Sequence, residues 1–378
     1  MYTAITRLSL SQFRTYASAS VSLEPAPVVL VGPNGIGKTN VLEAISYLGT
    51  GRGLRSATLQ EPCRMPGDHA WAVAAQVMIN GAPGPNIGIG LDPQSRSKRL
   101  VRINGANASG PLAISEYLTI SWLTPAMDRL FLEGTTGRRR FLDRLVLALQ
   151  PSHASTVSAY EKAMRQRNSL LSSDTPADPA WLTAIETQMA EHGVAIAAAR
   201  RELIAQLQSA TETQNASPFP KAIIALDGTA ELGLVSLPAA AVEAQLLDTW
   251  RATRLRDRAA GRTLEGPHRT DLKVRHGIKD QAAEQCSTGE QKALLIGLVL
   301  AHAQMVHALT GRGPILLLDE VAAHLDSARR SALFQQLLQS PGQAWITGTD
   351  HAFFDGFKGG AQILTVSDGK IAHRPETE

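Results

Sequence analysis

The sequence predicts an α/β fold: a mixed sheet with an antiparallel β subdomain beside it and a mostly helical lobe inserted between its two halves. Three observations lead to this prediction. The apolar run Val28–Val31 leads directly into a glycine-rich loop and then into helical periodicity. A second apolar run, Ile315–Leu318, ends in two carboxylates, and a long stretch of helical patterning separates the two runs.

The antiparallel subdomain is predicted from strand alternation and turn dipeptides in the N-terminal third. Residues 17–23 alternate apolar side chains with serines, and residues 71–79 alternate again before Asn80-Gly81. Residues 87–91 repeat the pattern, and Asn104-Gly105 marks a second turn. Period-2 alternation bounded by Asn-Gly is typical of antiparallel hairpins.

The inserted lobe is predicted from composition. Residues 180–214 contain no proline and are rich in helix formers, with Gly193 as a candidate interruption. Helical character resumes over 239–259. We therefore expect 1–124 and 260–378 to form one lobe from both chain ends, with 125–259 as the inserted helical lobe.

Composition favours a soluble cytoplasmic protein without a membrane partner. Of 378 residues, 44% are hydrophobic and 19% charged, a normal globular balance. The longest apolar candidate, 293–306, is shorter than the roughly 18 residues of a membrane span and contains His302 and Gln304. No signal-peptide pattern begins the chain, and two cysteines make neither a disulfide framework nor a zinc site.

The glycine-rich loop matches the Walker A pattern of P-loop NTPases, Gly-x-x-x-x-Gly-Lys-Thr. Its backbone N–H groups can surround phosphates, Lys38 can reach the β- and γ-phosphates, and the Thr39 hydroxyl can ligate Mg²⁺. The pattern predicts ATP and Mg²⁺ as cofactors. The candidate nucleotide-binding residues here are Gly32, Pro33, Asn34, Gly35, Ile36, Gly37, Lys38, Thr39 and Asn40.

The second apolar run has the Walker B form. Asp319 would hold Mg²⁺ together with Thr39, and Glu320 would polarise the attacking water. Glu320 and Lys38 are therefore the candidate catalytic residues. An apolar strand ending in Asp-Glu is usually structural by itself, but its pairing with the Walker A loop favours ATP hydrolysis.

Residues 286–291, Cys-Ser-Thr-Gly-Glu-Gln, resemble the Leu-Ser-Gly-Gly-Glu-Gln signature of ABC-type ATPases. Ser287, Gly289 and Gln291 would then meet the nucleotide held by a second subunit, although an ordinary helix cap explains the same residues. Residues 323–326 stand where this class has its D-loop. The switch residue is left open between Thr347, Thr349 and His351.

Several separated blocks resemble the RecF family of ABC-type ATPases. They are Leu8-x-Leu10-x-x-Phe13-Arg14-x-Tyr16, the loop and helix over 32–45, Thr124-Pro125-x-x-Asp128-Arg129-Leu130, residues 137–143, and Gly266-Pro267-His268-Arg269-Thr270-Asp271-Leu272. Lys38 and Ser287 lie 249 residues apart, farther than in transporter subunits, and the insertion is too short for a long coiled-coil arm.

The resemblance implies an ATP-dependent DNA-binding switch with weak, DNA-dependent ATPase activity. It would form an ATP-driven homodimer on single-strand/double-strand junctions of DNA gaps. With RecR and RecO it would promote RecA loading in repair, replication restart and SOS induction. The alternatives are an ATPase subunit of a membrane transporter and an SMC-like structural protein.

Charge is segregated along the chain, although the formal net charge is only +3. Residues 1–150 carry 15 basic and 9 acidic residues and 251–276 carry 8 and 3, whereas 151–250 carry 6 and 11. DNA contacts need cations aimed at phosphates. The alternative is a solvated helix face or internal ion pairs. The candidate DNA-binding residues are Arg138, Arg139, Arg140, Arg251, Arg254 and Arg258.

Overall fold

The computed structural model describes residues 2–66, 70–95, 98–173, 177–213, 218–323 and 325–373. The chain forms two compact units. The sheet unit comprises Met1–Asp128, Gln214–Pro220 and Thr288–Glu378, and the helical unit comprises Arg129–Thr213 and Lys221–Ser287. Gln214, the last residue of the predicted helix 180–214, and His324, in the predicted D-loop 323–326, lie outside the described residues.

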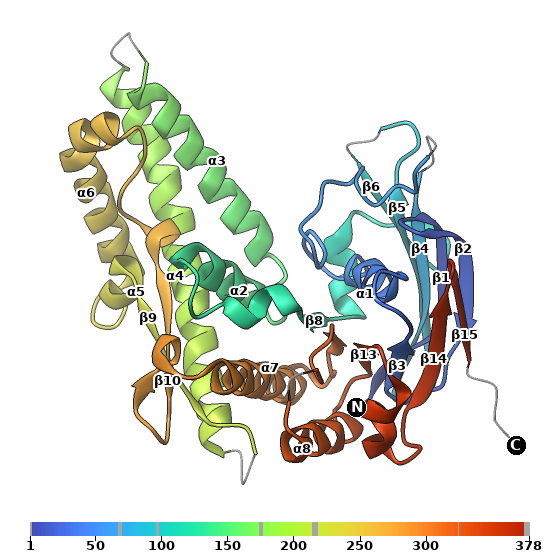
Figure 1. Cartoon of the computed structure of the whole chain (residues 1–378). Coiled ribbons are helices and arrows are strands. Elements are labelled where there is room, and N and C mark those ends of the chain that lie inside the picture. Colours follow the sequence, from blue (N-terminus) through green and yellow to red (C-terminus); the bar gives the residue numbers. More distant parts are fainter. Residues whose placement is uncertain are drawn as a thin grey trace, which may run out of the picture. The chain divides into compact units, whose positions relative to one another are not determined.

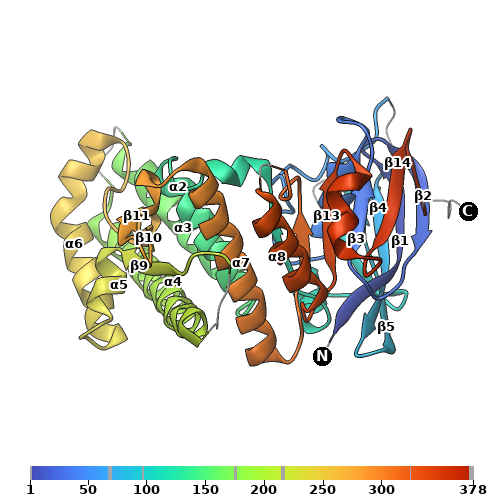
Figure 2. The ribbon, with the colours of Figure 1, turned by 60° about the horizontal axis from the view of Figure 1, so that its bottom comes forward.

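The central sheet of the sheet unit has the strand order β15-β14-β3-β13-β12-β8. Its strands β14, β3 and β13 are labelled in Figures 1 and 2. Its strands are β3 (Val28–Val31), β8 (Ile120–Leu123), β12 (Ile315–Leu318), β13 (Ala344–Gly348), β14 (Gln362–Ser367) and β15 (Lys370–His373). All pairs are parallel except β14–β15. Strand β13 therefore lies between the two motif strands β3 and β12, and their carboxyl ends meet at one edge.

Helices of the sheet unit are α1 (Lys38–Ser46), α7 (Thr288–Thr310) and α8 (Ser327–Leu338), with short 3₁₀ segments η1 (Pro111–Glu116), η2 (Pro125–Arg129) and η5 (His351–Phe357). Within the described residues, α7 is the one helix long and apolar enough to cross a membrane, but 67% of its apolar window is buried inside the protein. Burial of that kind is what a core helix shows.

The predicted antiparallel subdomain is a six-stranded sheet in the order β2-β1-β4-β5-β6-β7. Its strands are β1 (Thr3–Phe13), β2 (Tyr16–Ser22), β4 (Ala72–Ile79), β5 (Ala82–Leu91), β6 (Arg99–Ile103) and β7 (Ala106–Asn107). Both Asn-Gly dipeptides form the hairpin turns, with φ of 56° and 77° at Asn80-Gly81. The apolar residues of this sheet share a core with α1 and the central sheet.

The helical unit contains α2 (Thr135–Leu147), α3 (His153–Leu171), α4 (Pro179–Thr213), α5 (Thr229–Gly233) and α6 (Ala239–Ala260). Helices α3, α4 and α6 pack side by side (Figure 1). A small antiparallel sheet, β11-β10-β9, completes the unit with β9 (Ala222–Asp227), β10 (Asp271–His276) and β11 (Gln281–Ala282), next to η3 (Pro267–Arg269) and η4 (Ala283–Gln285).

Gly193 does not interrupt α4, which runs continuously over 35 residues. A Cβ at this position would lie 3.2 Å from Pro267 Cγ and 3.4 Å from Tyr160 Cε2. The glycine is therefore a close-packing position where η3 and α3 approach the helix, not a helix end.

The predicted lobe boundary at 260 was wrong. Residues 260–287 belong to the helical unit, because β10 pairs along its whole length with β9, and at its last two residues with β11, rather than with the central sheet. Residues 125–128, predicted to open the insertion, belong to the sheet unit. The C-terminal part of the sheet unit begins at the first residue of α7.

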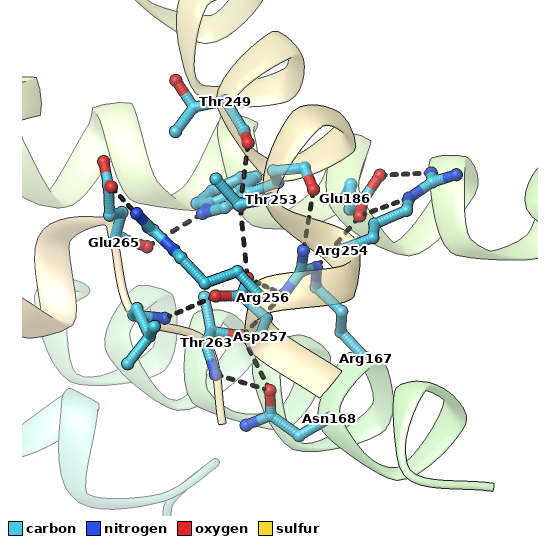
Figure 3. A network of polar contacts seen from close by, with 12 residues as sticks. Arg167, Asn168, Glu186, Thr249, Thr253, Arg254, Arg256, Asp257, Thr263 and Glu265 are labelled. Carbon is cyan, nitrogen blue, oxygen red and sulfur yellow. Dashed lines mark hydrogen bonds and ion pairs between the residues drawn. The ribbon is translucent and has the colours of Figure 1, made fainter. Parts of the chain in front are cut away.

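A buried network of polar side chains joins α3, α4 and α6 (Figure 3). The fully buried Arg167 guanidinium donates to Glu186 at 3.0 Å, Asp257 at 2.7 Å, Thr263 Oγ1 at 2.9 Å and the Trp250 carbonyl at 2.9 Å. Both carboxylates are themselves buried. One side chain from α3 thus fixes the other two helices and the segment that follows α6.

Candidate nucleotide-binding site

The glycine-rich loop lies between β3 and α1, as its sequence context predicts. Gly37 has a φ of 113°, and a Cβ there would lie 2.7 Å from Thr15 Oγ1 and 3.0 Å from Tyr16 Oη. The Tyr16 hydroxyl donates to the Gly37 carbonyl at 3.1 Å. Only glycine fits both this backbone conformation and this close approach, so the turn of β1 and β2 shapes the end of the loop.

Lys38 is buried at the start of α1. Its ammonium donates to the carbonyls of Gly32 at 2.7 Å and Pro33 at 2.9 Å. Burial lowers the pKa of Lys38 below its ordinary value, and the nearby carboxylates of Glu320 and Asp319 act in the opposite direction. The Lys38 ammonium therefore lies against the backbone of the glycine-rich loop.

Thr39 and Asp319 come together across the edge of the sheet. The Thr39 hydroxyl lies 3.0 Å from each oxygen of the Asp319 carboxylate. A hydroxyl and a carboxylate are hard oxygen ligands of the kind Mg²⁺ takes. Glu320 follows Asp319 with a left-handed φ of 51°. The sequence predicted Thr39, Asp319 and Glu320 as site residues, and the structure places Thr39 next to Asp319.

Thr347 is joined to the same pair of carboxylate residues. It lies in β13, its side chain is 1% exposed, and its hydroxyl donates to Asp319 Oδ1 at 2.8 Å. The Thr347 hydroxyl oxygen also accepts from the backbone N–H of Glu320 at 2.8 Å. Thr349 is exposed and His351 begins η5. Of the three candidates for the switch position, Thr347 alone has a hydrogen bond to the Walker B residues among those found in the described chain.

The sequence did not indicate Glu43, which organises the cations around α1. Its fully buried carboxylate accepts from Arg14 at 2.7 Å and 3.0 Å and from Arg55 at 2.9 Å. This partnership, chiefly the hydrogen bond to Glu43, raises the pKa of Arg14. The only sequence signal was a carboxylate on the apolar face of a predicted helix.

The signature residues occupy the beginning of α7. Ser287 is exposed and directly precedes the first helical residue, while Gly289 lies in the first turn. This arrangement fits both the helix cap and the anion site that the sequence left as alternatives. Gln291 is only 2% exposed in the core of the sheet unit. We therefore withdraw Gln291 as a contact to a nucleotide from another subunit.

The arginine candidates for DNA binding divide into two groups. Arg138 forms a bidentate ion pair with Asp271 at 2.6 Å and 2.9 Å, and Arg254 pairs with the buried Glu186 and is 20% exposed. Arg139 is half-buried and donates to the Thr270 carbonyl. These three hold the helical unit together. Exposed side chains remain at Arg140, Arg251 and Arg258.

The block 266–272 is the structural junction of the helical unit. Arg200 donates to the Pro267 carbonyl and to the carboxylates of Asp143 and Glu231, and Thr270 donates to Glu231. The His268 ring contacts the Tyr160 hydroxyl at 2.8 Å and the Thr263 carbonyl at 3.0 Å. Since a carbonyl only accepts, Nε2 carries the proton and Nδ1 accepts from Tyr160.

The stability of the helical unit should fall between pH about 6.5 and pH about 4. Burial lowers the pKa of His268 to about 4, with Arg139 and Arg269 adding to the effect. Between these values the unfolded chain binds the extra proton, so lowering the pH should cost on the order of 3 kcal/mol of unfolding free energy. His268→Gln, which keeps a donor and an acceptor, should reduce this pH dependence in urea titrations. His192→Gln, at a half-exposed position of α4, should retain this pH dependence. If the unfolding free energy changed equally with pH in the wild type and in both variants, the assignment of the effect to His268 would be contradicted.

The fold and the site define an ABC-type ATPase head. The model of the RecF/RecN/SMC N terminal domain matches residues 4–371. "DNA replication and repair protein RecF" of Mesorhizobium japonicum is 51% identical over 98% of this chain and 97% of its own length. Its counterpart in Rhizobium rhizogenes is 49% identical over 97% of this chain and 98% of its own. The chain belongs to the RecF family.

Solved structures agree with this fold. The recombination mediator protein RecF of the RecFOR pathway, in its ATP form, superposes with a TM-score of 0.83 at 21% identity over 98% of both chains. The Smc head domain of Pyrococcus furiosus, bound to the C-terminal domain of ScpA, gives 0.53 at 15% identity over 98% of this chain and 95% of that one. These two likenesses concern the fold.

Proposed function

We propose that this chain is an ATP-controlled DNA-binding switch of recombinational repair. ATP would drive a homodimer that binds single-strand/double-strand junctions at DNA gaps in the cytoplasm. With RecR and RecO it would promote RecA loading, supporting replication restart and SOS induction, and slow ATP hydrolysis would reset it. The observation that carries the proposal is the convergence of Lys38 and Thr39 with the Walker B carboxylates, in a chain whose relatives are named for DNA replication and repair.

The residues at the sheet edge fit MgATP. The Lys38 ammonium would bind the β- and γ-phosphates in place of the two loop carbonyls that it contacts. Thr39 Oγ1 and the Asp319 carboxylate, 3.0 Å apart, would supply two of the oxygen ligands of Mg²⁺. Glu320 would orient the attacking water and accept its proton, and the metal would neutralise phosphate charge.

The position of Ser287 supports the dimer. Exposed polar groups at the beginning of a 23-residue helix form an anion site, because the first N–H groups of a helix lack partners within it. Such a site would take the γ-phosphate held by a second copy of the chain. The nucleotide would then be the bridge between two subunits, which makes the dimer depend on ATP.

Three of the six candidate arginines are exposed, and we propose only these three as DNA contacts. Arg251 and Arg258 lie on α6 with their side chains in solvent, and Arg140 lies exposed on α2. Cations of this kind neutralise phosphates without reading base sequence. We keep these three as the proposed DNA contacts, although Arg251 pairs with the exposed Asp248 and Arg258 contacts the Ser173 carbonyl. We drop Arg138, Arg139 and Arg254 because their partners Asp271, Thr270 and Glu186 are buried.

Membership of the RecF family gives no support to the transporter alternative. That alternative requires a membrane permease as partner and an ATPase activity that is independent of DNA. The repair proposal requires no membrane permease and an ATPase activity that depends on DNA. Measuring ATPase activity with and without gapped DNA therefore separates the two.

Ser287→Arg should bind ATP with wild-type affinity and remain monomeric. The substituted side chain would block the exposed anion site at the beginning of α7 while leaving Lys38, Thr39 and Asp319 of the same chain intact. Equilibrium binding of a fluorescent ATP analogue and sedimentation with ATP measure the two properties separately. Ser340→Arg, which places the same side chain in the segment after α8, is the control and should dimerise with ATP. Loss of ATP binding in Ser287→Arg would contradict the proposal that Ser287 contacts the nucleotide held by the second subunit.

A further inference from the structure

We infer that Thr347 is a positioning residue for ATP hydrolysis, acting through the two Walker B carboxylate residues. This inference rests on the proposed function. Thr347 was one of three residues that the sequence left open for the switch position of ABC-type ATPases. Its hydrogen bonds assign it a supporting role. It fixes Asp319, which would bind Mg²⁺, and Glu320, which would orient the attacking water.

The strand order places Thr347 between the two nucleotide motifs. Strand β13 pairs with β3 on one side, with Thr347 opposite Leu30, and with β12 on the other, with Ile346 opposite Leu318. Asp319 is the first residue after β12. The Thr347 hydroxyl therefore sits at the carboxyl edge of the sheet, between the strand that enters the Walker A loop and the strand that ends in Walker B.

The hydroxyl of Thr347 donates and accepts at the same time. Its hydrogen goes to Asp319 Oδ1 at 2.8 Å, and a lone pair accepts the Glu320 N–H at 2.8 Å. Asp319 also accepts from Thr39, so the three side chains form one chain of hydrogen bonds from α1 to β13. A valine side chain has the same shape and can do neither.

The backbone of Glu320 has an uncommon conformation at the point where Thr347 contacts it. Its φ of 51° lies in the left-handed region that residues other than glycine adopt only when their surroundings impose it. The N–H that Thr347 binds belongs to that same residue. Fixing this N–H sets the direction in which the Glu320 side chain leaves the end of β12, and so where its carboxylate meets water.

Thr347→Val tests the inference because valine has the same shape and lacks the hydroxyl. We expect kcat for ATP hydrolysis to fall by on the order of ten- to a hundredfold, with KM for MgATP and ATP-driven dimerisation nearly unchanged. Thr347→Ser should restore kcat. Thr3→Val is the matched control: Thr3 is equally buried in the sheet unit, and its hydroxyl has no hydrogen-bond partner among the described residues.

Wild-type kcat in Thr347→Val, or an equal loss in the serine and valine variants, would overturn the inference. So would loss of ATP binding together with kcat, because that pattern marks a general structural role. If valine prevents folding, Thr347→Ser and Thr347→Ala give the same comparison, since both lack the methyl group and only serine keeps the hydroxyl. Failure of the proposed function is a separate result, in which the wild-type chain itself neither dimerises with ATP nor hydrolyses it.

Discussion

Replacing Lys38 with methionine should weaken ATP binding by on the order of a hundredfold and abolish ATP-driven dimerisation. The ammonium is the one cation that the structure places inside the glycine-rich loop, among the described residues, and it is buried there. Removing one partner of a buried charge pair costs about 2–5 kcal/mol, a factor of roughly thirty to several thousand in affinity. Titration of a fluorescent ATP analogue, with sedimentation at saturating ATP, measures both effects.

Methionine matches the apolar stem of Lys38 and lacks only the ammonium group, so the fold should survive. Lys370→Met, at an exposed position of β15, is the matched control and should bind ATP like the wild-type chain. Wild-type ATP affinity in Lys38→Met would contradict the placement of the phosphates against this side chain. A parallel loss in Lys370→Met would point instead to a general effect of removing positive charge.

Replacing Arg167 with leucine should destabilise the helical unit by about 3–5 kcal/mol. The change leaves two buried carboxylates, Glu186 and Asp257, without the charge that faces them in Figure 3. Arg254 still pairs with Glu186, but among the described contacts the Asp257 carboxylate keeps only neutral donors, from Thr253 and the Leu264 N–H. Urea unfolding, with hydrogen exchange of α3, α4 and α6 as the local probe, measures the loss.

Arg165→Leu, two residues away on α3, provides the control. Its side chain is 65% exposed and forms a 3.7 Å pair with Glu161, so its loss should cost less than about 1 kcal/mol. Arg167→Lys should remain strongly destabilised, because one ammonium cannot reproduce a planar fork that meets four acceptors. Equal unfolding midpoints for the 165 and 167 leucine variants would show that the buried network does not stabilise the unit.

Local signals in the sequence predicted the strand, loop and helix that carry the first nucleotide motif. A buried strand, a glycine-rich loop and a helix are consecutive in the chain, so Lys38 and Thr39 could be assigned from spacing alone. Asp319 followed from a second buried strand, and the structure brings it to Thr39. The hairpins at Asn80-Gly81 and Asn104-Gly105 were predicted for the same reason, because their turn chemistry is local.

Long-range partners could not be predicted in this way. Arg254 fell on a helical stripe with Arg251 and Arg258, but its carboxylate partner lies 68 residues earlier in the chain. Helical periodicity reports which residues share a face and carries no information on what that face meets. The boundary at 260 failed for a related reason: β10 follows the predicted insertion in sequence but takes its hydrogen bonds from β9 within it.

Thr347 was predicted in part from the sequence, but its contact with Asp319 was not. The sequence placed it at the end of a buried strand, near the switch position, but did not favour it over Thr349 or His351. Only the strand order, with β13 between β3 and β12, puts one of the three hydroxyl or imidazole groups against Asp319.

The affinity for a gapped DNA duplex, measured with ATP and with ADP on the same protein together with its sedimentation, tests the central claim most directly. The account predicts that ATP converts monomer to dimer and tightens DNA binding, while ADP does neither. Equal DNA affinity and an unchanged monomer in ATP and in ADP would contradict it.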